Sequence, residues 1–454
     1  MKTQDITKPC VVLRKAFFMK KTLLLFMFFT AQLLFGQQVI KTYYPPLYKE
    51  LKEEYSILNG DSTMIDGLYT KYFREGSVAK KGNFSEGKAN GVFEEYYENG
   101  SLMTKITFEN GEQTGGFEVF SRNGNPVQKG NYIRGVLNGE VLTYYDEGRL
   151  KNKSEFTDGK LNGENIEYYP NGNKKEQATY QSGTPIGKAY LYYDDEKTAA
   201  EFTYVEGEIQ GTYTTYYLNG SKELIYEYQE GLKNGAYTRY YANGNIWEKG
   251  SYIDGLLNGQ IEKFYQNGSK MELLKFQKGA KIGENKYFYI TGELERIENY
   301  TKVAKDVTIK EYHKNGELSV SKTYVNGFPV GTWPSYDDQG NLIEETPFKN
   351  GKISGYRKYY KGDLMVKRSQ YANGIKSGTE TEFYPSGKRK TETNYMNNKK
   401  SGLFYTYFET GELRIKGNHL NDLRHGTWTY YNKNGEPTKS EQYSEGRLMS
   451  SSEN

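Results

Sequence analysis

Cysteine is almost absent from this 454-residue sequence, and histidine, tryptophan and proline are scarce: one Cys, three His, three Trp and 11 Pro. The single cysteine, Cys10, precedes an apolar run near the N-terminus, so the chain beyond that run has none. Disulfides, thiolate metal sites and cysteine catalysis are thereby excluded there. What is plentiful is glycine (50) and tyrosine (45), a bias typical of many short strands joined by tight turns.

The N-terminal segment 1–36 has the layout of a secretory signal peptide. From Met19 it reads "MKKTLLLFMFFTAQLLFGQQ": two lysines, an apolar run over 23–35, then small and polar residues. The run is shorter than the roughly 20 residues of a spanning helix, and no cysteine follows it to carry a lipid anchor. We predict initiation at Met19, cleavage after Gly36, and an exported protein that is periplasmic, outer-membrane associated or secreted.

Charge gives no indication of a nucleic-acid partner. Residues 1–36 hold six of the 61 basic residues and one of the 57 acidic ones, which leaves 55 basic and 56 acidic residues beyond them. A near-neutral chain lacks the field that attracts nucleic acid. Neither a basic face nor an amphipathic helix is evident, so we expect membrane association to be weak or indirect.

A 24-residue repeat runs through the rest of the sequence. A glycine opens each of sixteen copies, with Val307 in its place once and one single-residue deletion after Gly355: Gly67, Gly91, Gly115, Gly139, Gly163, Gly187, Gly211, Gly235, Gly259, Gly283, Val307, Gly331, Gly355, Gly378, Gly402 and Gly426. An aromatic residue follows five places later in every copy, from Tyr72 to Tyr431. A second aromatic series stands seventeen places after the glycine, from Phe84 to Tyr443, with Tyr371 one place early after the deletion and His419 as a substitute in one copy.

Each copy is predicted to be one β-hairpin. Eight of the sixteen copies carry Asn-Gly between the two aromatic series, and this pair is the strongest short hairpin signal because both residues tolerate a positive φ. A second turn, such as "DGLLNG" at 254–259, joins one copy to the next, so the repeated glycines are interpreted as chain reversals rather than a phosphate loop. Strand alternation within 236–241 places Tyr237, Arg239 and Tyr241 on one face and Thr238 and Tyr240 on the other.

The predicted fold class is all-β: an elongated antiparallel β-hairpin repeat array, a solenoid-like curved ribbon of about sixteen copies. Stacked copies bury aromatic rows against their neighbours, so no central core is required. We predict four segments: the signal peptide 1–36, a degenerate capping repeat 37–66, the repeats 67–446 and a polar tail 447–454. Within 37–66, "LYKELKEEY" has a short helix as its alternative, and 447–454 is either a cap or a frayed tail.

The phrase G-x-aromatic-x-x-Tyr-Tyr-x-Asn-Gly, then aromatic-x-x-Gly-x-x-x-Gly, is most complete at 235–259, "GAYTRYYANGNIWEKGSYIDGLLNG". It resembles the variant form of the MORN (membrane occupation and recognition nexus) repeat over about residues 67–446. The resemblance implies an extended antiparallel sheet linked to membrane-surface attachment and protein scaffolding. Bacterial proteins similar to this are often labelled antitoxin-like. The family supplies no catalytic residues, and the predicted signal peptide departs from an antitoxin, which meets its toxin in the cytoplasm.

No motif assembles a catalytic, metal or cofactor site. His313, His419 and His425 lie in different copies or elements and are interpreted as repeat drift. The acidic pairs, such as Glu94-Glu95, point to opposite faces of a strand and are interpreted as solvated. We therefore predict a chain that is not an enzyme, with no metal ion and no cofactor.

The predicted function is a non-enzymatic scaffold of the cell envelope or exterior for protein partners. It rests on fixed structural positions alternating with variable ones, such as Lys71, Glu95, Val119 and Thr143, four places after the glycine. The alternatives are a cell-wall glycan-binding module and an antitoxin-like partner protein. For the glycan module the candidate stacking rings, expected to be exposed, are Tyr193, Tyr217, Tyr241 and Tyr265. The free strand edges of a long sheet also predict an edge-to-edge homo-oligomer.

Overall fold

The computed structural model describes residues 37–47, 49–61, 63–302 and 305–453. The predicted signal peptide, with Met19 and the cleavage site after Gly36, lies outside the described residues. The chain divides into two compact units, which are described separately. The smaller comprises the chain up to Gly100 with Phe108–Gly111, and the larger comprises Ser101–Thr107 with the chain from Glu112 onward. Every regular element in the described residues is a β-strand, which confirms the all-β hairpin array.

The smaller unit contains six strands, each antiparallel to the one it pairs with. They are β1 (Gln38–Tyr43), β2 (Leu51–Ile57), β3 (Ile65–Tyr72), β4 (Val78–Ser85), β5 (Lys88–Ala89) and β6 (Gly91–Tyr96). The strand β7 (Leu102–Glu109) contributes residues to both units.

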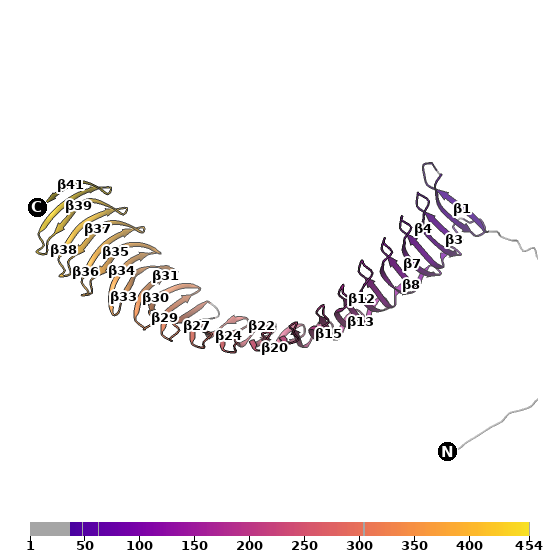
Figure 1. The fold of residues 1–454 in the computed structure, drawn as a ribbon, viewed down its shortest axis with the longest axis horizontal. Helices are drawn as coiled ribbons and strands as arrows, with labels where there is room; N and C mark the ends of the chain where they lie inside the picture. The colour runs from indigo at the N-terminus through magenta and orange to yellow at the C-terminus, as the bar shows by residue number, and fades with distance from the viewer. Residues whose placement is uncertain (1–36, 48, 62, 303–304, 454) are drawn as a thin grey trace, which may run out of the picture. The chain divides into compact units, whose positions relative to one another are not determined.

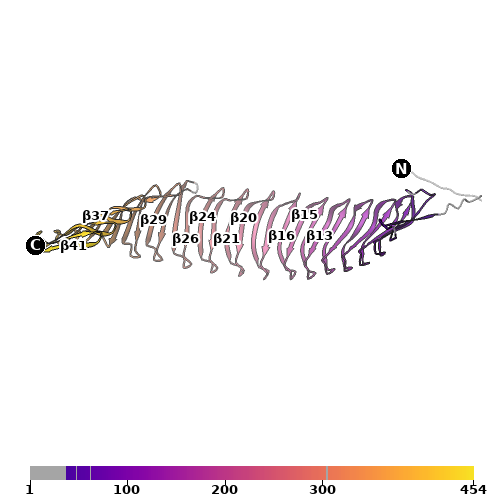
Figure 2. The ribbon, with the colours of Figure 1, turned by 90° about the horizontal axis from the view of Figure 1, so that it is seen from above.

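The larger unit continues the same pattern, and its strands lie side by side in chain order in both views (Figure 1 and Figure 2). They are β8 (Glu112–Phe120), β9 (Pro126–Ile133), β10 (Val136–Leu137), β11 (Gly139–Tyr144), β12 (Leu150–Thr157), β13 (Lys160–Tyr168), β14 (Lys174–Gln181), β15 (Thr184–Tyr192), β16 (Thr198–Val205), β17 (Glu208–Ile209), β18 (Gly211–Tyr216), β19 (Lys222–Gln229), β20 (Leu232–Tyr240), β21 (Ile246–Ile253), β22 (Leu256–Leu257), β23 (Gly259–Phe264), β24 (Lys270–Gln277), β25 (Ala280–Lys281), β26 (Gly283–Phe288), β27 (Leu294–Lys302), β28 (Asp306–Tyr312), β29 (Leu318–Val325), β30 (Phe328–Tyr336), β31 (Leu342–Lys349), β32 (Lys352–Ile353), β33 (Gly355–Lys361), β34 (Leu364–Ala372), β35 (Ile375–Phe383), β36 (Arg389–Met396), β37 (Lys399–Tyr407), β38 (Leu413–Leu420), β39 (Leu423–Tyr431), β40 (Pro437–Ser444) and β41 (Arg447–Glu453).

Where Asn-Gly is present it closes the hairpin, as predicted, but with a different geometry. In the copy from Gly235, the Gly244 amide donates to the Tyr241 carbonyl (2.9 Å), and only the glycine of the Asn243-Gly244 pair has a positive φ, at 87°. This is a type I turn completed by a left-handed glycine, with a register shift after Arg239. Asn243 therefore does not adopt the positive φ that the Asn-Gly pair tolerates. The shift also ends the strict alternation predicted for residues 237–241.

The turn with two positive φ values is the one that links copies. Asp254 (49°) and Gly255 (76°) form a two-residue loop between the paired residues Ile253 and Leu256, the geometry of a type I′ turn. The Gly255 amide donates to the Lys233 carbonyl of the preceding linking turn (2.9 Å). The same bond recurs between many neighbouring copies, for example from the Gly231 amide to the Ile209 carbonyl and from the Gly279 amide to the Leu257 carbonyl.

The opening glycines are not chain reversals, which corrects that interpretation. Gly235 lies inside β20 with φ of 121°, at a bulge where the pairing shifts between Tyr226 and Tyr228 of β19. A Cβ at Gly235 would lie 2.9 Å from the Cβ of Glu227, so close approach as well as backbone conformation favours glycine here. Where Val307 replaces the glycine, it pairs with Tyr300, and the register again shifts directly beside this pair, between Tyr300 and Lys302.

One copy has a non-glycine residue at the left-handed position of its hairpin turn. Glu196 stands there with φ of 68°, where other copies have a glycine such as Gly220 (83°). We expect Glu196→Gly to raise the free energy of unfolding by about 1 kcal/mol, because left-handed φ costs a residue with a Cβ about 1–2 kcal/mol. Urea unfolding followed by circular dichroism tests this, with Gly220→Ala as the control that should lower stability. Equal stability of Glu196→Gly and the parent would contradict it.

The core is a row of side chains on one face, here called the inner face. Tyr237, Ile261, Leu274 and Tyr287 form one buried cluster along consecutive copies. Glycines oppose the bulkiest members: a Cβ at Gly250 would lie 2.2 Å from the Ile261 Cδ1 atom. Large and small residues therefore interlock along the sheet, in place of a central core.

The terminal segments also form strands. The segment with a helix as its alternative overlaps β2, which pairs with both β1 and β3. The hydroxyl of Tyr44 donates to the Tyr72 carbonyl in the first complete copy (2.7 Å), so the leading segment contacts that copy as a cap. At the other end, most of the segment predicted as a polar tail is β41, which pairs with β40.

Candidate binding surface and the tyrosine row

The four candidate stacking rings belong to a row at the hairpin turns, six residues after the opening glycine. Each hydroxyl donates to a backbone carbonyl 23 residues ahead, in the next copy. The bonds are Tyr193 to Tyr216 (2.6 Å), Tyr217 to Tyr240 (2.7 Å), Tyr241 to Phe264 (2.9 Å) and Tyr265 to Phe288 (2.8 Å). Tyr145, Tyr169, Tyr289 and Tyr384 make the same bond. The row therefore connects successive copies along the edge opposite the linking turns.

These rings are half-buried, rather than exposed as expected. Burial raises the pKa of the Tyr217 and Tyr265 hydroxyls, and Tyr241 lies beside Trp247 with the ring centres 6.1 Å apart. With each hydroxyl already donating to a carbonyl, a ligand could use only the remaining ring surface. The structure places the four rings in consecutive copies but does not gather them into one pocket.

The three histidines occupy structural positions. His313 replaces the turn tyrosine, and its Nε2 lies 3.0 Å from the Tyr336 carbonyl; because a carbonyl only accepts, Nε2 carries the proton in this bond. His419 is buried between the rings of Phe404 and Trp428, and burial lowers its pKa. His425 pairs with Asn418 across β38 and β39.

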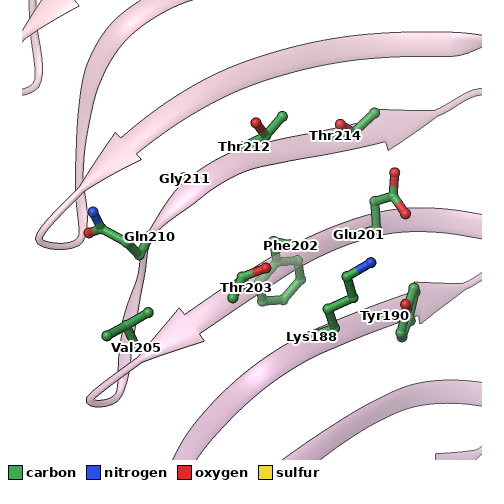
Figure 3. Close-up of a pocket in the computed structure, with 10 residues that line it drawn as sticks. All are labelled: Lys188, Tyr190, Glu201, Phe202, Thr203, Val205, Gln210, Gly211, Thr212 and Thr214. Carbon is green, nitrogen blue, oxygen red and sulfur yellow. The ribbon is translucent and has the colours of Figure 1, made fainter.

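A hollow of about 360 Å³ lies on the face opposite the core, the outer face (Figure 3). Lys188 and Tyr190 of β15, Glu201 of β16, and Thr212 and Thr214 of β18 contribute side chains to it. Glu201 accepts a hydrogen bond of 2.5 Å from the hydroxyl of Tyr216. The hollow thus combines an aromatic ring, one cation, one carboxylate and several hydroxyl groups, a set able to hydrogen-bond a polar ligand.

Sequence reasoning did not single out this hollow. Four of the residues that line it occupy the first and third places after Gly187 and Gly211, where the repeat has no fixed residue. Side-chain size is the feature of the sequence that could have indicated the hollow. Thr212 and Thr214 are short, whereas Lys188 and Tyr190 at the same places in the preceding copy are longer. Comparing those places between adjacent copies would have indicated a recess.

Buried carboxylates on the inner face are ionised and paired. Glu441 accepts hydrogen bonds from Tyr430 (2.7 Å) and Tyr443 (2.9 Å), with Lys439 Nζ 2.7 Å and Arg424 3.7 Å away. The Lys439 ammonium and the tyrosine hydroxyls lower the pKa of Glu441 to about 2. A carboxylate so stabilised is a poor proton donor or acceptor near neutral pH, which favours a structural role.

This pairing predicts an acid-dependent loss of stability. The unfolded carboxyl has a pKa near 4.5 and the folded one about 2, so the contribution of Glu441 is complete above pH 4.5 and is lost as pH falls toward 2. Above pH 4.5 we expect Glu441→Gln to be less stable than the parent. As the pH falls from 4.5 toward 2, the variant should lose less stability than the parent loses. Urea unfolding from pH 6 to pH 2 measures this, and Glu445→Gln, at an exposed turn of the same copy, should behave like the parent. Identical pH profiles for Glu441→Gln and the parent would refute the assignment.

Within the described residues, no three or more His, Cys, Asp or Glu side chains are grouped so as to hold a metal ion. Nor does the described part of the chain contain a helix with the length and apolar character needed to cross a membrane.

The geometry defines the class: a β-hairpin repeat protein in which copies are joined edge to edge by recurring hydrogen bonds. The family model of the MORN repeat variant matches residues 89–110, 161–182, 233–254, 329–350 and 376–397. Each match begins two residues before an opening glycine and ends at the following linking turn. These five copies are therefore MORN repeat variants, and the copies between them share the same strands and turns.

No curated protein matches the chain. Similar solved structures include the crystal structure of TcdB2-TccC3, at 11% identity over 89% of this chain with a TM-score of 0.14, and the Photorhabdus luminescens Tc holotoxin pore, at 11% identity over 89% with a TM-score of 0.14. The matches span 27% and 26% of those chains. A likeness with so low a TM-score supports no conclusion about this protein.

Proposed function

We propose that the chain is an exported, non-enzymatic repeat protein that acts as a protein-interaction scaffold in the cell envelope or exterior. The observation that supports this most is a row of exposed, variable side chains on the outer face. In the larger unit they follow the opening glycine directly and include Glu140, Lys188, Gln260 and Tyr356. Their backbone positions recur with the repeat, so the row presents different chemistry at regular spacing.

The sequence alone predicts recognition through residues four places after the glycine, and the exposed row takes their place in this proposal. Residues four places after the glycine, such as Glu95, lie on the inner face, where Glu95 pairs with Lys80 at 2.8 Å and the equivalent Tyr287 is buried. The exposed outer-face residues directly after the glycine are more accessible to a partner. A rigid frame with variable exposed positions suits extended recognition of proteins, because little conformational entropy is lost on binding.

Capture from envelope extract tests the scaffold role. The native protein is compared with a variant in which the exposed row is permuted among the copies, leaving glycines, inner face and turn tyrosines intact. We expect a defined protein to bind the native row alone, and its purified form to bind with an affinity that the permuted variant loses. Equal binding by both variants would contradict recognition through this row.

Export is a separate part of the proposal and rests on the sequence of residues 19–36. Fractionation of cells expressing the chain from Met19 tests it. We expect a shortened product outside the cytoplasm; a full-length cytoplasmic product would contradict export and would favour the antitoxin-like alternative, which rescue from a co-expressed toxin would then test.

Cell-wall glycan binding is the second candidate function. The outer-face hollow is a better candidate for the glycan site than the row of turn tyrosines is. Thr212→Leu should fill the hollow while leaving the fold intact, since Leu68 and Leu403 occupy the same place in other copies. If the hollow binds glycan, retention on purified peptidoglycan or polysaccharide should be lost in this variant and kept in Tyr217→Phe. The reverse result would favour the turn tyrosines, and no retention by the native protein would exclude the glycan role.

A further inference from the structure

The outer face of the larger unit has a second hollow, two repeats beyond the one already described. The first hollow includes Tyr190 and Glu201, three and fourteen places after Gly187 (Figure 3). The second hollow has a volume of about 300 Å³ and includes Lys249, fourteen places after Gly235, and Glu262 of the following copy. The two hollows therefore occupy equivalent places in the repeat.

A row of directly paired residues connects the two hollows across the strands. Between them it consists of Thr214, Ile225 and Thr238, which pair with one another across β18, β19 and β20. The row continues through Glu201 into the first hollow and through Lys249 into the second. Neighbouring strands are about 4.8 Å apart, so the four steps from Glu201 to Lys249 span roughly 19 Å.

The middle of this row is low because the side chains around it are short. The copies from Gly211 and Gly235 are the only two adjacent copies in which the first and third places after the glycine hold only threonine or alanine. These residues are Thr212, Thr214, Ala236 and Thr238. In the copies on either side the same places hold longer side chains, such as Tyr190 and Gln260. The two hollows thus form the ends of one depression from Tyr190 to Glu262, here called the outer trough.

The polar groups of the outer trough are balanced in charge. The first hollow has Lys188 and Glu201, and in the second the Lys249 ammonium lies 3.8 Å from the Glu262 carboxylate. A surface without an excess of positive charge does not attract a polyanion. Its hydroxyl groups can hydrogen-bond an uncharged polar ligand, and the Tyr190 ring offers an apolar surface on which a sugar ring can stack.

A peptide would gain little from the backbone at this position. Strand addition requires a free sheet edge, whereas β18, β19 and β20 each pair with a strand on both sides. The trough therefore suits a polymer that is recognised through hydroxyl groups along its length. A linear polysaccharide has this chemistry.

We propose that the outer trough binds a linear, uncharged polysaccharide whose chain runs across the strands and occupies both hollows at once. This inference rests on glycan binding, the second candidate function above, and adds that one chain engages two sites. Joining two sites through one ligand strengthens binding, because the second contact becomes intramolecular. An oligomer that fills only one hollow lacks this gain.

Oligomer length gives the first test, with chito-oligosaccharides and cello-oligosaccharides as the probes. Isothermal titration calorimetry of the purified protein measures the affinity and the number of oligomers bound. For at least one series we expect two short oligomers to bind each chain, but only one long oligomer. The long oligomer should bind on the order of 100-fold more tightly.

Filling one hollow at a time gives the second test. Thr212→Leu fills the first hollow and Ala236→Leu the second. Each variant should bind one short oligomer in place of two, and should bind the long oligomer about 100-fold more weakly than the parent does. The control is Thr427→Leu, outside the trough. It removes a hydrogen bond to Gln442 (2.8 Å) that matches the one from Thr212 to Glu227 (2.9 Å), and it should bind like the parent.

The outcomes separate this proposal from glycan binding in general. Equal affinity for short and long oligomers, or a long oligomer unaffected by Ala236→Leu, would overturn the bridging chain and leave the first hollow as a single glycan site. Binding of neither series at about 1 mM would overturn the proposal, while retention of the parent on peptidoglycan would still support the glycan role. A control weakened as much as the filled variants would also overturn it, because the loss would then not arise in the trough.

Discussion

Replacing Trp428 by alanine is expected to lower the free energy of unfolding of the C-terminal copies by about 3–5 kcal/mol, the usual cost of removing a large buried ring. Trp428 is 1% exposed and its indole N–H donates to the Asn418 carbonyl (3.2 Å). Phe404 and His419 pack against it with ring centres 5.2 and 5.1 Å away, and Arg424 lies 4.2 Å over it. The variant removes all of these contacts and leaves a cavity that a single-layer sheet can fill only by local collapse.

Hydrogen exchange is the appropriate measurement, because a repeat array need not unfold in one step. We expect exchange to accelerate in the amides of residues 404–443 while amides before residue 350 keep the protection of the parent. Equal acceleration along the whole larger unit would show that the copies do not unfold separately, and an unchanged rate at 404–443 would contradict the packing role of Trp428.

Gly417 provides the matched control for this prediction. A Cβ at Gly417 would lie 2.3 Å from the Trp428 Cδ2 atom, so Gly417→Ala should destabilise the parent by about 1–3 kcal/mol through overpacking. In the Trp428→Ala background the same methyl group has room, and its cost should disappear. Additive costs in the double variant would contradict direct packing between the two residues.

The fold could be predicted from sequence because its determinants are local and repeated. Hairpins are specified within each copy by the 24-residue period, the turn glycines and the aromatic places, independently of the rest of the chain. The family match covers five of these copies. Turn geometry was harder, since Asn-Gly fits two turn types. Which turn type forms depends on the register shift between Arg239 and Tyr240. This shift is a feature of strand pairing, which a sequence pattern does not show.

The candidate site was less predictable because its properties depend on contacts between copies. The sequence identifies a row of turn tyrosines, but not that the Tyr217 hydroxyl bonds a carbonyl 23 residues ahead and so buries part of the ring. The hollow beside Tyr190 likewise depends on Thr212 and Thr214 of the next copy. Both follow from the stacking of copies, which turns residues distant in sequence into neighbours.

On the inner face, the same pair of positions holds two apolar residues in one copy and an ion pair in the next. In the copy from Gly259, Leu257 and Leu274 occupy the places two before and fifteen after the glycine, and both pack in the core. In the next copy the same places hold Lys281 and Glu298, whose charged groups lie 3.0 Å apart. Stability therefore requires that the two places match each other, rather than that both be apolar.

This matching leads to the second large effect, at Glu298. The carboxylate is 7% exposed and accepts hydrogen bonds from Tyr287 (2.8 Å) and Tyr300 (3.1 Å), with Arg296 at 3.4 Å and Lys281 at 3.0 Å. Glu298→Leu leaves the Lys281 ammonium beside an apolar side chain. We expect it to lower the free energy of unfolding by about 3–5 kcal/mol, the cost of breaking a buried ion pair.

The double variant Lys281→Leu/Glu298→Leu reproduces the solution of the preceding copy and removes both charges together. Arg296 keeps its place 3.9 Å over the Tyr287 ring, with its side chain still 37% exposed. Replacing a buried pair by apolar residues is often neutral or stabilising, so we expect the double variant to recover the stability of the parent to within about 1 kcal/mol. Urea unfolding of the parent, both single variants and the double variant measures the coupling. A double variant as unstable as Glu298→Leu alone would show that the tyrosine hydroxyls require the carboxylate, and that the two solutions are not interchangeable at this position.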